Sequence, residues 1–384
     1  LGPRFRLPLA PERVATLDLL GVVRTAGDPT ELREEVGYDA HLDYADGSNR
    51  RHGWGLGVRA SQLVNAIETQ PLSRSEIGWS ALLLHRDYRD YYINEGVAFY
   101  GYYWAGPSVR VEGGWRTENQ RSVPANDPWT LFRSDENWRA NPLIDDGQFK
   151  TVHVGLTYDT RNESQLATSG TWVRLTWERS ASADVAPVGY PSTVRDPIPT
   201  DGSYAFHRFW LDARAYNRLT PSMRVNARLV GGGWAGGDPL PLQQRNSLGG
   251  PGGLPGYSFR HSTCNEGAPL DPARPALCDR SLMFQLEFRS RLDLGLLYRY
   301  RDRTQVEQTF GVDQVDLVVH TDMGKAWLVG NGPGRVPSNK IPNFDEWMYD
   351  IGVGLDAGAI GVYLSKALND GEPMRFFVRL QRRF

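Results

Sequence analysis

An apolar residue at every second position is the feature that most constrains this chain. In residues 171–179, Val173, Leu175 and Trp177 alternate with charged or hydroxyl-bearing side chains. Successive side chains of a β-strand point to opposite faces, so a period of two gives the strand one apolar and one polar face. The same alternation recurs along most of the chain and predicts an all-β fold.

The number of alternating segments suggests the size of the sheet. The clearest segments are 151–159, 171–179, 223–229, 282–289, 347–355, 360–364 and 376–380, and the weaker ones are 36–44, 53–60, 77–85, 96–104 and 108–117. In all we count roughly fifteen strands by this pattern. A bacterial single-chain membrane barrel has an even number of strands, so about sixteen is the nearest choice.

The polar faces of these segments decide between two all-β architectures. In a soluble sandwich or propeller they would meet solvent, whereas in a membrane barrel they line a wet lumen and aromatic residues gather at strand ends. Mean hydropathy is −0.47, and no apolar run approaches the roughly 18 residues of a membrane-spanning helix, which excludes a helical membrane protein. We expect a transmembrane antiparallel β-barrel in the bacterial outer membrane, with the sandwich as the alternative.

The connections between segments differ in length. Long ones, rich in Pro, Asn, Asp and Gly, span 120–147, 180–202, 231–279 and 330–345. Long loops that alternate with tight turns are typical of an outer-membrane barrel, which we assign to residues 36–384. Residues 1–35 lack clean alternation and are expected to form a separate N-terminal segment, which is a short helix, a strand or a plug.

Charge and motifs exclude several function classes. The chain has 43 basic and 45 acidic residues, and this balance argues against nucleic-acid binding. It contains no G-x-S-x-G, P-loop, H-E-x-x-H or C-x-x-C motif, and its histidines lack metal-ligand spacing. Two G-x-G-x-x-A matches, at 55–60 and 352–357, lie inside alternating segments rather than at a helix start. We therefore predict no enzymatic activity and no cofactor.

The two cysteines fall in one long connection. Cys264 and Cys278 follow the glycine-rich segment 248–261, and the chain has no other cysteines. A pair of this kind is expected to form a local disulfide in an oxidising compartment, and two free thiols are the alternative.

Several longer segments follow one another in a characteristic order. A hairpin that begins Asp-Thr-Arg-Asn is followed by a glycine-rich loop that ends in Gly-Tyr, and then by the last strands of the sheet. These segments are 158–180, 241–257, 282–292, 318–327, 350–368 and 374–384. In order and spacing they resemble the bacterial surface-antigen barrels of the BamA/TamA superfamily, well over residues 141–384 and loosely over 36–120.

The resemblance implies a sixteen-stranded barrel whose sixth surface loop folds back into the lumen. In that family an arginine near the loop tip pairs with acidic residues of the inner wall. Gly249 and Gly250 lead into the loop here, and Gly256 and Tyr257 match the end of its motif. Pro255 stands where the arginine is expected.

The acidic partners implied by the family are present. Glu287 and Asp322 match its positions, and the alternation places both on the lumen face. Arg260 is the nearest candidate for the missing loop arginine, so we predict a clamp of Arg260 with Glu287 and Asp322. The alternative is that Arg260 faces solvent and the carboxylates bind Arg289 or Lys325.

The end of the chain resembles the signal by which outer-membrane barrels are recognised for insertion. Phe376, Val378 and Leu380 fall at even spacing before Phe384. Arg382 interrupts this apolar series, and the alternative is an ordinary last strand of a soluble sheet.

The family resemblance also sets the expected function. Its insertion and secretion members carry periplasmic POTRA domains ahead of the barrel, and residues 1–35 are too few for one. We expect a barrel without POTRA domains that moves protein or lipid into or across the outer membrane. It would contact outer-membrane lipids and lipopolysaccharide and act with separate periplasmic or outer-membrane protein partners. A structural anchor or scaffold within an outer-membrane assembly, or a passive pore, are the alternatives.

Overall fold

The structure is a computed structural model of the chain. It describes residues 2–23, 36–47, 52–67, 72–123, 129–164, 166–189, 195–262, 264, 277–301, 307–358 and 360–384.

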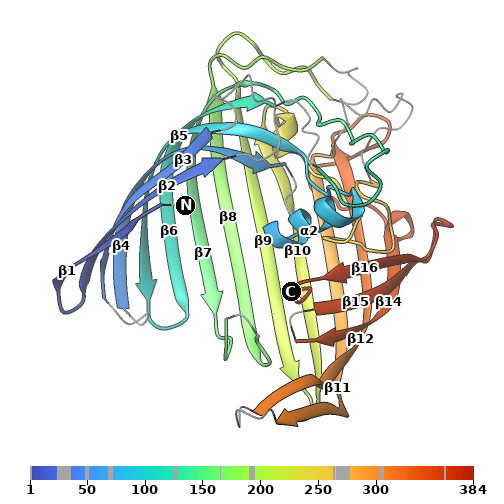
Figure 1. Ribbon diagram of the computed structural model, residues 1–384. Coiled ribbons are helices and arrows are strands. Elements are labelled where there is room, and N and C mark those ends of the chain that lie inside the picture. Colours follow the sequence, from blue (N-terminus) through green and yellow to red (C-terminus); the bar gives the residue numbers. More distant parts are fainter. Residues whose placement is uncertain are drawn as a thin grey trace.

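One large antiparallel sheet makes up most of the described residues (Figure 1). Its strands are β1 (Arg4–Ala10), β2 (Arg13–Val23), β3 (Val36–Asp46), β4 (His52–Ala66), β5 (Tyr91–Ala105), β6 (Val109–Ser122), β7 (Gly147–Asp159), β8 (Gly170–Ser182), β9 (Ala205–Arg218), β10 (Met223–Gly237), β11 (Arg280–Arg301), β12 (Glu307–Val329), β13 (Arg335–Val336), β14 (Met348–Ala357), β15 (Ile360–Ala367) and β16 (Arg375–Arg379). The sheet has sixteen strands, and every one except β13 lies antiparallel beside its neighbours in chain order. The two-residue β13 pairs in parallel with β12. The predicted all-β antiparallel fold and strand number are confirmed.

The sheet curves on itself as the wall of a barrel does. Figure 1 shows it bending from β1, in blue, round to β16, in red, and in both ribbon views the C-terminus lies within the curve. Among the described residues β1 pairs with β2 and β16 with β15, and no pairing joins β1 to β16. The described strands therefore form one continuous curved wall. Among the described residues, its two edge strands, β1 and β16, are not joined by backbone pairing.

The alternation read from the sequence separates an outer from an inner face. On β14, Ile351, Val353 and Leu355 are exposed, whereas the flanking Asp350 and Asp356 are buried. Apolar side chains on the outside and polar ones inside are the arrangement of a membrane barrel. We call the inward-facing side chains of the strands the inner wall. No helix among the described residues is long and apolar enough to cross a membrane.

The N-terminal segment forms strands where the structure describes it. Residues 4–10 and 13–23 make the β1–β2 hairpin, and β2 pairs with β3 along its whole length. The sequence left a short helix, a strand or a plug open for this segment, and its described part forms strands. Residues 24–35 lie outside the described residues.

One expected strand is a helix. Residues 77–85 were predicted as a weak strand but belong to α2 (Arg74–Leu84). Ser73 caps this helix: its hydroxyl accepts from the backbone N–H of Glu76, and the Glu76 carboxylate accepts from the backbone N–H of Ser73. This reciprocal capping box satisfies two otherwise free donors and fixes the start of the helix, so it outweighs a short alternating pattern.

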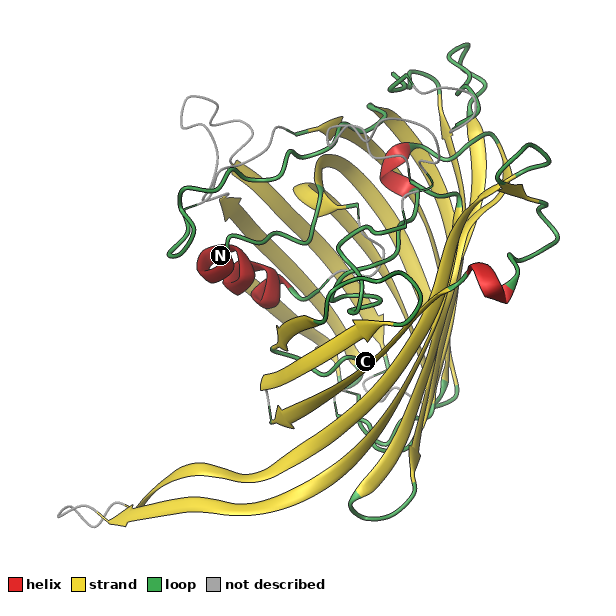
Figure 2. Ribbon diagram, turned by 90° about the vertical axis from the view of Figure 1, so that its right-hand side faces the viewer, coloured by secondary structure: helices red, strands yellow, loops and turns green. Residues whose placement is uncertain are grey.

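The connections differ between the two ends of the barrel. Those after β4, β6, β8, β10 and β12 are long, and two of them carry the short 3-10 helices η1 (Leu242–Gln244) and η2 (Phe344–Glu346). Those after β1, β5, β9 and β14 are tight turns. Figure 2 shows the β11–β12 hairpin extending beyond the other strands. The predicted alternation of long loops and tight turns is therefore present.

The exposed apolar side chains of the outer face lead to a testable prediction. Val353 lies in the middle of β14 with 49% of its surface exposed. Replacing it with arginine puts a charge against lipid and should lower the free energy of unfolding by about 2 to 4 kcal/mol, the cost of a basic residue near the bilayer midplane. Urea unfolding in lipid vesicles, followed by tryptophan fluorescence, measures this loss. Val353→Leu is the matched control, and equal stability of the two variants would contradict an outer face in lipid.

Candidate functional site on the inner wall

The loop between β10 and β11 contacts the inner wall through its backbone. The carbonyl of Gly253 accepts from Gln285 Nε2 at 3.0 Å, and the backbone N–H of Gly256 donates to Asp350 Oδ2 at 2.8 Å. Tyr257 donates its hydroxyl to the backbone oxygen of Tyr349 at 3.0 Å. These bonds hold the loop tip against β11 and β14, which are far apart in the sequence.

The glycines of the predicted loop motif have structural reasons. A side chain at Gly256 would place its Cβ 2.6 Å from Asp350 Cβ and 2.7 Å from the backbone nitrogen of Ala367, so only glycine allows this close approach. Gly249 has a φ of 118°, in a region that side chains rarely adopt. Pro255 and its neighbours on either side are buried.

A disulfide joins the far part of this loop to the start of β11. Cys264 and Cys278 are bonded, with an S–S distance of 2.08 Å and Cα atoms 5.3 Å apart. Cys278 also exchanges two backbone hydrogen bonds with Asn246, of 2.7 and 2.8 Å. Residues 263 and 265–276, between the cysteines, lie outside the described residues.

Arg260 does not make the predicted clamp. Its guanidinium forms an ion pair with Asp90, which immediately precedes β5, and both side chains are buried. Arg139 forms a second ion pair with the same carboxylate. A buried carboxylate without a counter-charge is costly, and Asp90 lies next to Arg260, whereas Glu287 and Asp322 already have other cations. The expectation of a clamp from Arg260 was wrong.

Glu287 is bound by its own strand neighbour. It lies fully buried on the inner wall of β11, as the alternation predicted. Arg289 Nε donates to Glu287 Oε1 at 2.7 Å, and Asn226 Nδ2 donates to the same oxygen at 2.7 Å. Arg289 also pairs with Asp356 of β14. Glu287 therefore binds Arg289, as the alternative to the Arg260 clamp expected.

Asp322 is bound by the C-terminal segment. Arg383, itself buried, forms an ion pair with Asp322 Oδ2, and His320 Nδ1 lies 3.1 Å from the same oxygen. Burial alone would lower the pKa of Arg383, but the carboxylates of Asp322, Glu287 and Asp350 raise it above its usual range. Arg383 therefore lies where the family resemblance leads one to expect a loop arginine.

Sequence reasoning missed Arg383 because it treated the chain end as one apolar series. Phe376 and Val378 are exposed on the outer face of β16, but the strand ends at Arg379, and Leu380 and Phe384 lie beyond it. The insertion signal therefore stays a prediction. The available clue was the pair of arginines at 382–383, which breaks the apolar series.

Basic side chains dominate part of the lumen. A cavity of about 530 Å³ is bordered by β8, β9, β10 and the chain end. Its six arginines are Arg174, Arg208, Arg214, Arg228, Arg379 and Arg383. Two carboxylates, Glu178 and Asp212, lie among them and form ion pairs with three of the six. The cavity is polar and large enough to hold many water molecules.

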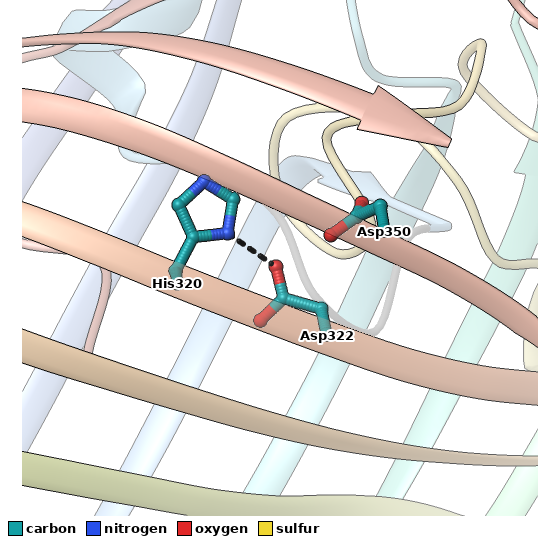
Figure 3. A group of neighbouring side chains, drawn as sticks. All are labelled: His320, Asp322 and Asp350. Carbon is teal, nitrogen blue, oxygen red and sulfur yellow. Dashed lines mark hydrogen bonds and ion pairs between the residues drawn. The ribbon is translucent and has the colours of Figure 1, made fainter. Parts of the chain in front are cut away.

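One group of side chains on the inner wall could hold a metal ion. His320, Asp322 and Asp350 each offer a ligand atom, and these atoms lie within 4.8 Å of one another (Figure 3).

Comparison with known proteins identifies the fold. No family model matches the chain, and no curated protein sequence matches it. Among solved structures, BamA from Haemophilus ducreyi lacking POTRA domains 1–3 is similar with a TM-score of 0.50 and 11% identity, over 98% of this chain and 69% of that chain. CdiB from Acinetobacter baumannii has a TM-score of 0.43 and 11% identity, over 95% of this chain and 55% of that chain. CdiB from Escherichia coli has a TM-score of 0.42 and 12% identity, over 98% of this chain and 57% of that chain. The chain therefore has the barrel fold of BamA.

The pairing of the C-terminal segment with the inner wall makes a second prediction. Arg383→Ala leaves Asp322 buried beside Asp350 without its guanidinium, and breaking a buried pair in this way costs about 3 to 5 kcal/mol. The folded form should then lose its heat resistance at a clearly lower temperature, seen as the shift between folded and unfolded bands on a gel. Arg382→Ala is the matched control, because Arg382 is more exposed and lies 3.9 Å from Asp316. An equal effect of both substitutions would remove Arg383 from its assigned role.

Proposed function

We propose that this protein is an outer-membrane barrel that moves protein or lipid into or across the outer membrane together with separate partner proteins. Three features support the proposal: the BamA-type fold, a lumen lined with charged side chains, and a loop tip and chain end that rest against the inner wall through non-covalent bonds. Outer-membrane lipids and lipopolysaccharide would contact the apolar outer face. The proposal assigns no catalytic step to the chain.

The observation that carries this proposal is the way in which the end of β16 is held. Glu76 of α2 accepts from Arg379 Nε at 2.6 Å and from the backbone N–H of Leu380 at 3.0 Å. Among the described residues the one strand that pairs with β16 is β15, over five residue pairs. A side-chain contact to a helix of a distant connection can break without unfolding the sheet, so this edge of the wall can move.

The charge state of Glu76 suits such a contact. Burial raises the pKa of Glu76, but Arg379 and the capping bonds from Ser73 lower it by more, so its pKa lies below the usual value. Glu76 is therefore charged at neutral pH. Both side chains of this ion pair are buried, so its separation has a cost, but it breaks only the contacts to Glu76 and leaves the β15–β16 ladder intact.

A locking experiment tests the proposal. Cysteines in place of Glu76 and Arg379 can be joined by a short bifunctional maleimide, which ties α2 to β16. The native Cys264–Cys278 disulfide has no free thiol and does not react. Cells that lack the protein are expected to show altered levels of outer-membrane proteins or of surface lipopolysaccharide. The double-cysteine variant should restore them before cross-linking and fail to sustain them afterwards.

Single-cysteine variants treated with the same reagent are the controls, because they carry the modification without the lock. Full activity of the locked protein would contradict a mobile edge. A steady, large conductance in planar bilayers would indicate a passive pore instead. Loss of one protein complex with otherwise normal membrane composition would indicate a scaffold.

A further inference from the structure

Two carboxylates and an imidazole meet on the inner wall of neighbouring strands. His320 and Asp322 lie on β12, and the register of the sheet places Asp350 of β14 directly opposite Asp322. One oxygen or nitrogen from each side chain lies within 4.8 Å of the others. Figure 3 shows one carboxylate oxygen of Asp322 at the ring of His320 and the carboxylate of Asp350 turned toward this pair.

This space is closed to solvent. His320 and Asp322 have 1% of their surface exposed and Asp350 has none. Asp322 Oδ2 already has His320 and Arg383 as partners, and Asp350 Oδ2 accepts from the backbone N–H of Gly256. The second oxygen, Oδ1, of each carboxylate is buried and has no hydrogen-bond partner. A buried acceptor without a hydrogen-bond partner has lost its bound water and gained no bond in return. A bound ligand would therefore stabilise both oxygens.

The charges around the group are out of balance. When both aspartates are ionised they bring two negative charges, and Arg383 supplies one positive charge. Glu287, a further buried carboxylate of the inner wall, is already bound by Arg289 at 2.7 Å. One negative charge is therefore left in a site that water cannot reach, which favours a bound cation.

His320 is oriented as a metal ligand usually is. Its Nε2 lies 3.0 Å from the hydroxyl of Ser365, on β15, and its Nδ1 lies 3.1 Å from Asp322 Oδ2. The ring has two neutral tautomers: with its proton on Nδ1 it donates to Asp322 Oδ2, and with its proton on Nε2 it donates to the Ser365 hydroxyl and leaves the Nδ1 lone pair free for a cation. That lone pair then faces the oxygens of the aspartates, where only a proton or a cation can lie between them.

We propose that His320 Nδ1, Asp322 Oδ1 and Asp350 Oδ1 bind a divalent transition-metal ion, with Zn²⁺ preferred. A ligand set of one imidazole and two carboxylates suits Zn²⁺ or Mn²⁺ better than Ca²⁺ or Mg²⁺, and Zn²⁺ binds such sites more tightly than Mn²⁺. Ligand distances of about 2.0 to 2.2 Å require the three groups to draw together by side-chain rotation.

The ion would connect three parts of the wall. It bridges β12 and β14 directly, and through the bond of Asp350 to Gly256 it supports the tip of the β10–β11 loop. This inference does not depend on the proposed transport function, since a metal site of this kind would strengthen the loop contact in any outer-membrane barrel.

Metal binding to the full chain tests the inference. The protein is purified in detergent without an affinity tag, stripped with EDTA and titrated with ZnCl₂ in a calorimeter. The wild type should bind one equivalent. His320→Gln and Asp350→Asn should each weaken binding at least tenfold, because even the loss of a residue that only orients a metal ligand costs about 10- to 100-fold in affinity. Asp212→Asn is the matched control, because Asp212 is a buried wall carboxylate bound by two arginines.

A second measurement needs no variant and therefore does not depend on how the variants fold. X-ray absorption of the Zn²⁺-loaded wild type should show one imidazole nitrogen and otherwise oxygen ligands. The inference is overturned if the wild type binds no stoichiometric Zn²⁺, if the bound ion has no imidazole or several, or if both variants bind as tightly as the control.

Discussion

Glu287, Asp322 and Asp350 are carboxylates that water does not reach, and the arrangement of the inner wall follows from the need to match them. Arg289 matches Glu287 from within the same strand, and Arg383 matches Asp322 from the chain end. The second of these pairings ties the C-terminal segment to the wall. The charges of the wall therefore decide where the C-terminal segment lies, and the backbone bond from Gly256 to Asp350 adds the loop tip to the same region.

The loop tip is held at the wall without an arginine at position 255. Pro255 cannot offer a charge, yet the adjoining Gly256 still approaches the wall so closely that a Cβ would collide with Asp350. The loop is thus held by backbone bonds and tight packing, while the positive charge comes from Arg383. Arg260 serves a different carboxylate, Asp90, ahead of β5.

The sequence predicted those features that depend on local periodicity. Alternation placed Glu287 and Asp322 on the inner face because a strand fixes the direction of each side chain. It misassigned residues 77–85, where the capping bonds between Ser73 and Glu76 decide for a helix. It also could not assign Arg383 to Asp322, because the two residues are brought together by the path of the chain after β16 and no local pattern encodes that path.

The central claim is that Arg383 is the counter-charge of Asp322, and a double-mutant cycle measures it most directly. Asp322→Asn, Arg383→Gln and the double variant are compared with the wild type by urea unfolding in lipid vesicles. The account predicts that the double variant loses about 2 kcal/mol less free energy of unfolding than the two single variants lose in sum, as for a buried pair in contact. Additive losses, with no coupling between the two positions, would contradict it.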